Sequence, residues 1–451
     1  MKNHSFLLTL LGAMVALMCS CSSRNQELMR TVPKDTQCLM LADVARLSPK
    51  LQEKPSLISD GIIALSGRFL PSSNSAEMKK IWDFVFSEGS GADFSFPLAF
   101  FEHHNALIAT LGLDDAEEFR KGIESATGSR FIEYKGVRSL PDNTVFTCGS
   151  QAWIAAPYPK VSADDILGFV ALTPEASVLS VDLASSLGAG TADVAGFINL
   201  KAVMPYENPA LMLGLNSVLE DLKYFAFNVD FNDGEAVGNI RLLNSGCTPA
   251  VSALPFLKID VPKLEAFPGK GNLFVATALD PSVMKPLLSG FGSMAPIPAE
   301  LREALSAIDG NLVFSAFTGN EGAPVSSVSL MVSFADRTSA EKCRKSIEES
   351  GLADGLVPGV DGNSLLLISP SREGDGIREV ASSFSDAGLG IVFLTAPLGP
   401  DSAPEVKDLL SKVVVRGLQD GRGLKFDFSV ATKKGSNSLF SLLQLSSFLK
   451  K

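Results

Sequence analysis

The order of predicted elements in the first half of the chain recurs in the second half. A strand pattern at residues 107–111 precedes an amphipathic helix, and the same pattern at residues 330–334 precedes another helix. The two helices carry matching stretches at residues 119–124 and 343–348. Chance could produce one such match, but the shared order favours duplication of one unit. This repeat restricts the possible folds more than any other feature of the sequence.

Tight turns join most of the predicted strands. Asn232-Asp233-Gly234-Glu235 lies between strand patterns at residues 224–231 and 236–242, which predicts a β-hairpin. Strands joined in this way pair antiparallel, and helices that arrive singly favour one face of a sheet. We therefore expect an α+β fold of two similar units of antiparallel sheet with helices packed on one face. The expected units are residues 31–248 and 249–451.

Residues 1–20 are predicted to be a lipoprotein signal peptide. Lys2 supplies a positive start, and residues 6–18 form an almost unbroken apolar run. A helix of that length spans about 20 Å at ~1.5 Å per residue, which is short of a hydrocarbon core of ~30 Å. The run therefore favours a cleaved export signal over a transmembrane helix.

The end of this segment resembles the bacterial lipobox, in which a small residue precedes a cysteine that is diacylated and becomes the new N-terminus. Cys21, preceded by Ser20, is the predicted lipidation site, and Cys19 is the alternative. Residues 21–30 are polar and are expected to form a tether between lipid and body. The competing interpretation is an ordinary secreted protein with two incidental cysteines.

The remainder of the chain is acidic and has a globular composition. Its 46% hydrophobic and 20% charged residues are typical of a folded protein. The formal net charge is −11, and because Lys2 is the only charged residue of the signal, the mature chain carries −12. Phosphate groups of nucleic acids and anionic lipids repel such a chain. We expect no nucleic-acid partner, and a membrane attachment that depends on the N-terminal acyl chains.

Histidine and cysteine do not form a recognisable catalytic or metal-binding pattern. Outside the signal, the only histidines are His103 and His104, which are adjacent in a predicted turn and are expected to lie in solvent. The four remaining cysteines lie far apart without a C-x-x-C pair, which argues against a zinc knuckle or a redox motif. We expect them to be buried free thiols, although an exported location permits disulfides. These cysteines are Cys38, Cys148, Cys247 and Cys343.

The acidic clusters are better explained as helix caps than as catalytic pairs. Asp114 is followed by Glu117, a capping box at the start of a predicted helix. Glycosidase chemistry needs two carboxylates that face each other across a sugar, and nothing in the spacing indicates such a pair. Phosphate-binding loops and a G-x-S-x-G nucleophile motif are absent from the sequence. The sequence therefore predicts no catalytic, cofactor-binding or metal-binding residues.

Several short motifs carry a family resemblance. They are Val32-Pro33-Lys34-Asp35 with its following strand and Asp43, residues 99–156 ending in Gln151-Ala152-Trp153-Ile154, and the closing Asn437-Ser438-Leu439 through Leu443. With these motifs the chain resembles an uncharacterised family of Bacteroidetes envelope lipoproteins, classed as a domain of unknown function. The resemblance implies a two-part α+β lipoprotein and brings no catalytic residues.

These observations favour a lipid-anchored cell-envelope protein that binds or scaffolds and is not an enzyme. Its partner would be an envelope protein or a small molecule, or it would be a structural member of an envelope complex. The alternative is a carboxylate-dependent hydrolase that acts on envelope or dietary glycans. Ser22-Ser23-Arg24-Asn25 lacks an acidic run, which resembles outer-membrane lipoproteins that face the periplasm.

Overall fold

A computed structural model provides the structure of the protein. It describes residues 28–51, 59–60, 62–63, 75–180, 192–203, 222–250, 257–279, 307–317, 327–351, 353, 355–370, 375–394, 409–420, 423–432, 435, 437–439 and 441–442. The predicted signal peptide, Cys19 and Cys21 lie outside these ranges. Among the helices that are described, none has the length and apolar character needed to cross a membrane.

The first half of the chain forms eleven strands and several short helices within the described ranges. The strands are β1 (Cys38–Ala42), β2 (Ala92–Asp93), β3 (Leu98–His103), β4 (Ala106–Leu113), β5 (Ile132–Tyr134), β6 (Val137–Ser139), β7 (Val145–Cys148), β8 (Gln151–Ala155), β9 (Val194–Asn199), β10 (Leu222–Asn232) and β11 (Glu235–Asn244). The helices are α2 (Val44–Leu47), α4 (Ser75–Val85), α5 (Ala116–Thr127), α6 (Ala163–Val170) and α8 (Leu200–Val203), with 3-10 turns η1 (Ser48–Leu51), η2 (Pro174–Ala176) and η3 (Val178–Ser180).

The second half forms a similar succession of elements. Its strands are β12 (Lys270–Gly271), β13 (Leu273–Leu279), β14 (Ile308–Phe317), β15 (Ser327–Phe334), β16 (Val357–Asp361), β17 (Ser364–Ile368), β18 (Asp375–Gly376), β19 (Leu389–Leu394), β20 (Leu410–Asp420) and β21 (Gly423–Thr432). Its helices are α10 (Val261–Glu265) and α13 (Arg337–Ser350), with 3-10 turns η4 (Ile377–Glu379) and η5 (Ala381–Phe384).

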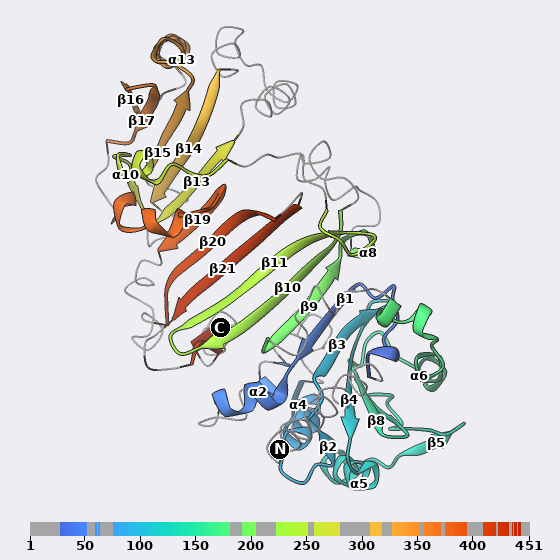
Figure 1. Ribbon diagram of the computed structural model, residues 1–451. Coiled ribbons are helices and arrows are strands. Elements are labelled where there is room, and N and C mark those ends of the chain that lie inside the picture. The colour runs from blue at the N-terminus through green and yellow to red at the C-terminus, as the bar shows by residue number, and fades with distance from the viewer. Residues whose placement is uncertain are drawn as a thin grey trace, which may run out of the picture.

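One antiparallel sheet runs through both halves (Figure 1). In the first half the pairing order is β8–β4–β3–β1–β9–β10–β11. In the second half the order is β17–β15–β14–β13–β19–β20–β21. β11 then pairs with β21, from Glu235 opposite Ala431 to Arg241 opposite Lys425, and joins the two halves. The expected class, α+β with antiparallel pairing, is confirmed.

The longest strands of the sheet meet where the hairpin was predicted. β10 and β11 pair from Leu222 to Asn232 on one strand, and the pairing closes at Asn232 opposite Glu235. Gly234 has a φ of 75°, a left-handed conformation that glycine adopts without a steric cost. The hairpin prediction is confirmed, with both strands longer than the sequence pattern indicated.

The expectation that helices pack on one face of the sheet is wrong. Phe100 and Phe101 are neighbours on β3 and therefore point to opposite faces. Phe100 contacts Trp82 of α4, with ring centroids 5.9 Å apart, whereas Phe101 contacts Phe169 of α6 at 5.6 Å. The physical reason is in the sequence of β3, whose residues Leu98 to Phe101 are all buried without alternation. Both faces of the strand therefore need a cover.

Packing of the body begins earlier in the chain than predicted. Leu28 is buried in the core that Phe101 and Trp153 share, so the last residues of the predicted tether belong to the folded body. The four cysteines within the described ranges form no disulfide, as expected. Only Cys343, on α13, is fully buried, and burial raises the pKa of its thiol to about 11. The other three are partly exposed.

Candidate functional site

The seam between β11 and β21 brings polar residues of four strands into one row. Asn228 of β10 lies opposite Asn239 of β11, and Asn239 lies opposite Asp427 of β21. Asp427 in turn lies opposite Arg416 of β20. Residues that are directly opposite in an antiparallel pair point to the same face of the sheet. One face of the sheet therefore carries a polar row across the junction of the two halves.

This row forms the floor of a groove of about 520 Å³, which we call the seam groove. The size lies within the range of small-molecule sites in proteins, about 300–1,000 Å³. The side chains that line the groove come from β10, β11, β20, β21 and the turn η5. They are Asn228, Asp230, Glu235, Val237, Asn239, Ser383, Lys412, Val414, Arg416, Asp427, Ser429 and Ala431; Gly238 and Phe428, which are opposite each other on β11 and β21, also border the groove.

Hydrogen bonds hold several of the lining side chains in place. Asn239 Nδ2 donates to Asn228 Oδ1 at 2.7 Å, and this bond orients both amides. Lys412 Nζ donates to Ser383 Oγ at 2.7 Å, which ties η5 to the wall of the groove. Asp427 accepts from Lys425 Nζ at 2.9 Å. The floor of the groove is therefore preorganised before any ligand arrives.

Two arginines at the seam have unused hydrogen-bonding capacity. Arg416 is partly buried and forms no ion pair with the residues that the structure describes. Arg241 lies on the same face, opposite Lys425, and its Nε is buried without a hydrogen-bond partner. The pKa of Asp386 is lowered, chiefly by a hydrogen bond from Lys258, and Arg416 adds a longer-range attraction. Arg416 and Arg241 therefore keep unused donors at this end of the seam groove, whose lining also holds the carboxylates of Asp230, Glu235 and Asp427.

The reverse face of the same strands is apolar. Phe227 lies opposite Ile240, and Ile240 lies opposite Phe426, so hydrophobic side chains cross the seam there. Gly238 lies opposite Phe428, and a Cβ at Gly238 would come within 2.6 Å of the Phe428 ring. Glycine at this position lets the ring lie against the backbone. The two faces of the central strands therefore differ in chemistry, and only one suits a polar ligand.

A buried carboxylate fixes one end of the groove. Asp193, which precedes β9, is fully buried and pairs with Arg46 at 3.1 Å and with Lys50. Its Oδ2 also accepts a hydrogen bond from the backbone N–H of Phe231 at 2.7 Å. Arg46 reaches on to Asp230, a lining residue of the groove, at 3.1 Å. The network therefore connects α2 and η1 to the end of β10.

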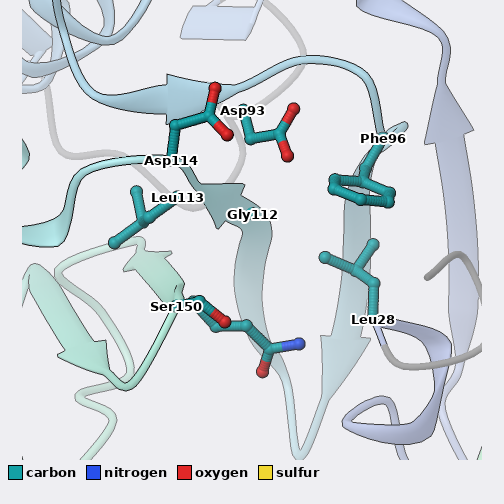
Figure 2. A pocket seen from close by; sticks show the side chains of 8 residues that line it. Leu28, Asp93, Phe96, Gly112, Leu113, Asp114 and Ser150 are labelled. Atoms are coloured by element: carbon teal, nitrogen blue, oxygen red, sulfur yellow. The ribbon is translucent and has the colours of Figure 1, made fainter.

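A second pocket, of about 350 Å³, lies at the end of β4 (Figure 2). Asp93 and Asp114 stand on one side of it, and Ser150 stands on the other. Asp93 Oδ1 accepts hydrogen bonds from the N–H and the hydroxyl of Ser95, at 2.9 and 2.6 Å. One of the two carboxylates is therefore already engaged by its own turn.

The residues considered from sequence do not converge on either pocket, except Asp114. His103 ends β3 and is half-buried, with its ring 5.6 Å from Phe169 and 4.0 Å from His104. The expected location in solvent is therefore wrong for His103 and right for His104, which is exposed. Burial lowers the pKa of His103. The helix cap was predicted one residue early, since Asp115 and not Asp114 accepts the N–H bonds at the start of α5. In the described ranges no three His, Cys, Asp or Glu side chains cluster as metal ligands do.

Sequence reasoning missed the seam groove, although a signal was present. Lys425, Asp427 and Ser429 alternate with apolar residues on β21, whereas on β20 three valines separate Lys412 from Arg416. Alternation of this kind indicates a strand with one polar face. It does not indicate which strands pair, and the groove exists only through that pairing.

Comparisons with known proteins add little to this description. No protein-family model matches the chain, and no curated protein matches its sequence. Among solved structures, the chain is similar to TP0453 in crystal form I, with 12% identity, a TM-score of 0.29, and coverage of 49% of this chain and 80% of that one. Crystal form III gives 10% identity, a TM-score of 0.29, and coverage of 78% and 96%. Values this low do not establish a shared fold.

Proposed function

We propose that this chain is a lipid-anchored protein of the cell envelope that binds a small anionic molecule in the seam groove and is not an enzyme. The observation that carries the proposal is Arg416, a partly buried guanidinium in a groove whose polar floor is preorganised. A guanidinium in such a place is suited to a bidentate bond with a carboxylate or a phosphate.

The charges around the groove favour an anion over a cation. Three carboxylates line the groove. Asp427 and Asp230 are paired with Lys425 and Arg46 respectively, and Glu235 lies four residues along β11 from Asn239, which shares the row of Arg416. Arg416 and the nearby Arg241 keep free donors. The amides of Asn228 and Asn239 can add hydrogen bonds to hydroxyl or carbonyl groups of the same ligand. A hydroxyl-bearing acid fits this set of groups.

The location is proposed from the sequence. The apolar run of residues 6–18 and the lipobox-like Ser20-Cys21 favour an acylated N-terminus at Cys21, with Cys19 as the alternative. The resemblance to Bacteroidetes envelope lipoproteins and the absence of an acidic run after Cys21 favour the outer membrane facing the periplasm. Partial protease digestion of intact cells tests this location, since a body on the outer surface would be cleaved.

We also propose that the two halves arose by duplication, with units at residues 31–248 and 249–451. The matching pairing orders of the two halves support this, as does the placement of α5 after β4 and of α13 after β15. On this view the seam groove lies between two copies of one unit, and its residues were free to diverge in each copy.

The binding proposal is tested by thermal unfolding with inorganic phosphate, succinate and glucuronate as probes. We expect at least one probe to raise the melting temperature of the wild type, because a ligand that binds only the folded state stabilises it. Arg416→Gln removes a charged hydrogen bond of about 1.5–3 kcal/mol, which weakens binding by roughly 10–100-fold.

The matched control is Arg337→Gln, which alters an exposed arginine on α13 and should leave the response unchanged. An equal response of the wild type and Arg416→Gln, or no response to any probe, would contradict the proposed anion site.

A glycan hydrolase is the second candidate, because Asp93 and Asp114 flank the smaller pocket. Such an enzyme would release reducing sugar from envelope or dietary glycans and would lose that activity in Asp114→Asn. If Asp114→Asn kept the full hydrolase activity, the smaller pocket would not be the active site of that enzyme.

A further inference from the structure

The β5–β6 hairpin presents apolar side chains to solvent at one edge of the sheet. β5 pairs with β6, and no other described strand pairs with β5. Ile132 is 58% exposed and Tyr134 is 44% exposed, and both lie on one face of the strand. Figure 1 shows β5 extending outward from the body. The exposed isoleucine and tyrosine at this protruding tip are free to contact another surface.

The hairpin lies at the same end of the sheet as the start of the described chain. Leu28 lines the smaller pocket together with Gln151 of β8. β8 pairs with β7 at Gln151 and Cys148. β7 pairs with β6, and β6 pairs with β5 at Arg138 and Glu133. β5 is therefore three strand spacings of ~4.8 Å from β8, a distance of about 14 Å.

The lipid anchor can reach this end of the body. Six residues lie between Cys21 and Leu28, and the seven Cα–Cα steps that join them span at most about 25 Å when extended. The β16 edge, at the other end of the sheet, lies fourteen strand pairings from β8, or roughly 67 Å along the sheet at ~4.8 Å each. A bilayer that holds Cys21 is therefore close to the β5–β6 hairpin and far from β16.

The chemistry of the hairpin also suits a membrane surface. Tyrosine has an apolar ring and a polar hydroxyl, a combination that favours the region of the lipid headgroups. Lys135 lies over the Tyr134 ring at 4.8 Å, and residues 130–138 contain three basic side chains and one acidic side chain. Lys135 also pairs with Asp164 and Arg138 with Glu133, but both pairs are exposed and can exchange for lipid phosphates. Basic residues are attracted to anionic headgroups, whereas the acidic body as a whole is repelled.

We propose that the β5–β6 hairpin contacts the bilayer in which the lipid anchor is inserted, with Ile132 and Tyr134 in the headgroup region. This contact rests on the proposed lipidation of Cys21. It gives the anchored body a defined side toward the membrane and leaves the seam groove accessible from the aqueous compartment.

The test uses the full mature protein, extracted in mild detergent and reconstituted into vesicles of phosphatidylethanolamine and phosphatidylglycerol. Tyr134→Trp places a reporter in the hairpin, and Val357→Trp is the matched control on β16, where Val357 is 60% exposed. The native Trp82 and Trp153 are buried and contribute equally to both variants. Lipids with brominated chains quench only a tryptophan that enters the bilayer surface.

We expect brominated vesicles to reduce the emission of Tyr134→Trp and to leave that of Val357→Trp unchanged. Intact mass is measured first, since a Cys21 without acyl chains would refute the anchor and this inference together. A lipidated protein in which both variants respond equally, or in which Tyr134→Trp is not quenched, would overturn the hairpin contact alone. Protection of Tyr134→Trp only in the presence of another envelope protein would likewise overturn it.

Discussion

Replacement of Asp193 by alanine should destabilise the N-terminal half of the protein more than any surface change. The carboxylate is fully buried, and it accepts from Arg46 Nε at 3.1 Å and from the Phe231 N–H at 2.7 Å, in addition to its pair with Lys50. Asp193→Ala leaves all three donors without their acceptor. The loss is therefore that of a charged network and not of one surface ion pair.

The magnitude follows from the exposure of the partners. Breaking a buried ion pair costs about 3–5 kcal/mol when the remaining charge stays buried. The side chains of Arg46 and Lys50 are 41% and 24% exposed, so water can solvate them after the change. The Phe231 N–H is part-buried, so water replaces its lost hydrogen bond less completely than it solvates the two charged side chains. We therefore expect a loss of about 3 kcal/mol in the free energy of unfolding, at the low end of that range.

Urea unfolding followed by tryptophan fluorescence measures this change. Trp82 and Trp153 are the only tryptophans of the chain, and both lie in the N-terminal half, where Asp193 is placed. With a slope of about 2 kcal/mol per molar urea, the midpoint should fall by about 1.5 M. Lys121→Ala, which removes an exposed pair with Glu117, should leave the midpoint unchanged. If the midpoint of Asp193→Ala decreased by less than about 0.3 M, the reasoning would be refuted, because that decrease corresponds to a loss of less than ~0.6 kcal/mol.

Two further predictions concern packing and pH. Gly122→Ala should lower the free energy of unfolding by about 1–3 kcal/mol, because its Cβ would lie 2.0 Å from the Phe84 ring between α4 and α5; the same urea assay measures it. Burial against Phe169 lowers the pKa of His103 from 6.5, so the unfolded chain binds the proton more tightly. Stability should therefore decline as pH falls below 6.5 toward the folded pKa, and His103→Gln should remove that part of the decline in midpoints measured between pH 7.5 and 5.

Part of the fold could be predicted because its signals are local. The turn residues before Glu235 determine the β10–β11 hairpin, since asparagine, aspartate and glycine adopt the conformations that a tight turn requires. The helix α5 begins within one residue of its predicted start, because a capping aspartate acts only on the next few N–H groups. Free thiols were also predictable from the spacing of the cysteines, although Cys38 and Cys148 are more exposed than expected.

The placement of helices and the candidate site were not predictable in the same way. The unbroken apolar residues of β3 require cover on both faces, but their sequence does not say which helices supply it. Arg416 and Asn239 lie in one row, with Asp427 between them, only because β11 pairs with β21. Each strand could satisfy its backbone hydrogen bonds with any neighbour of matching length, so sequence alone does not select the partner.

The sequence by itself determined the element types, the hairpin, the order of elements in each half and the acidic charge of the body. These properties depend on residues that are close together in the chain, where turn chemistry and hydrophobic periodicity act directly. The tertiary structure alone decided the seam, because pairing of β11 with β21 joins residues that are far apart in the sequence. Hydrophobic residues such as Phe227, Ile240 and Phe426 alternate with the polar ones along these strands, so the observed register gathers Asn228, Asn239, Asp427 and Arg416 on the opposite face.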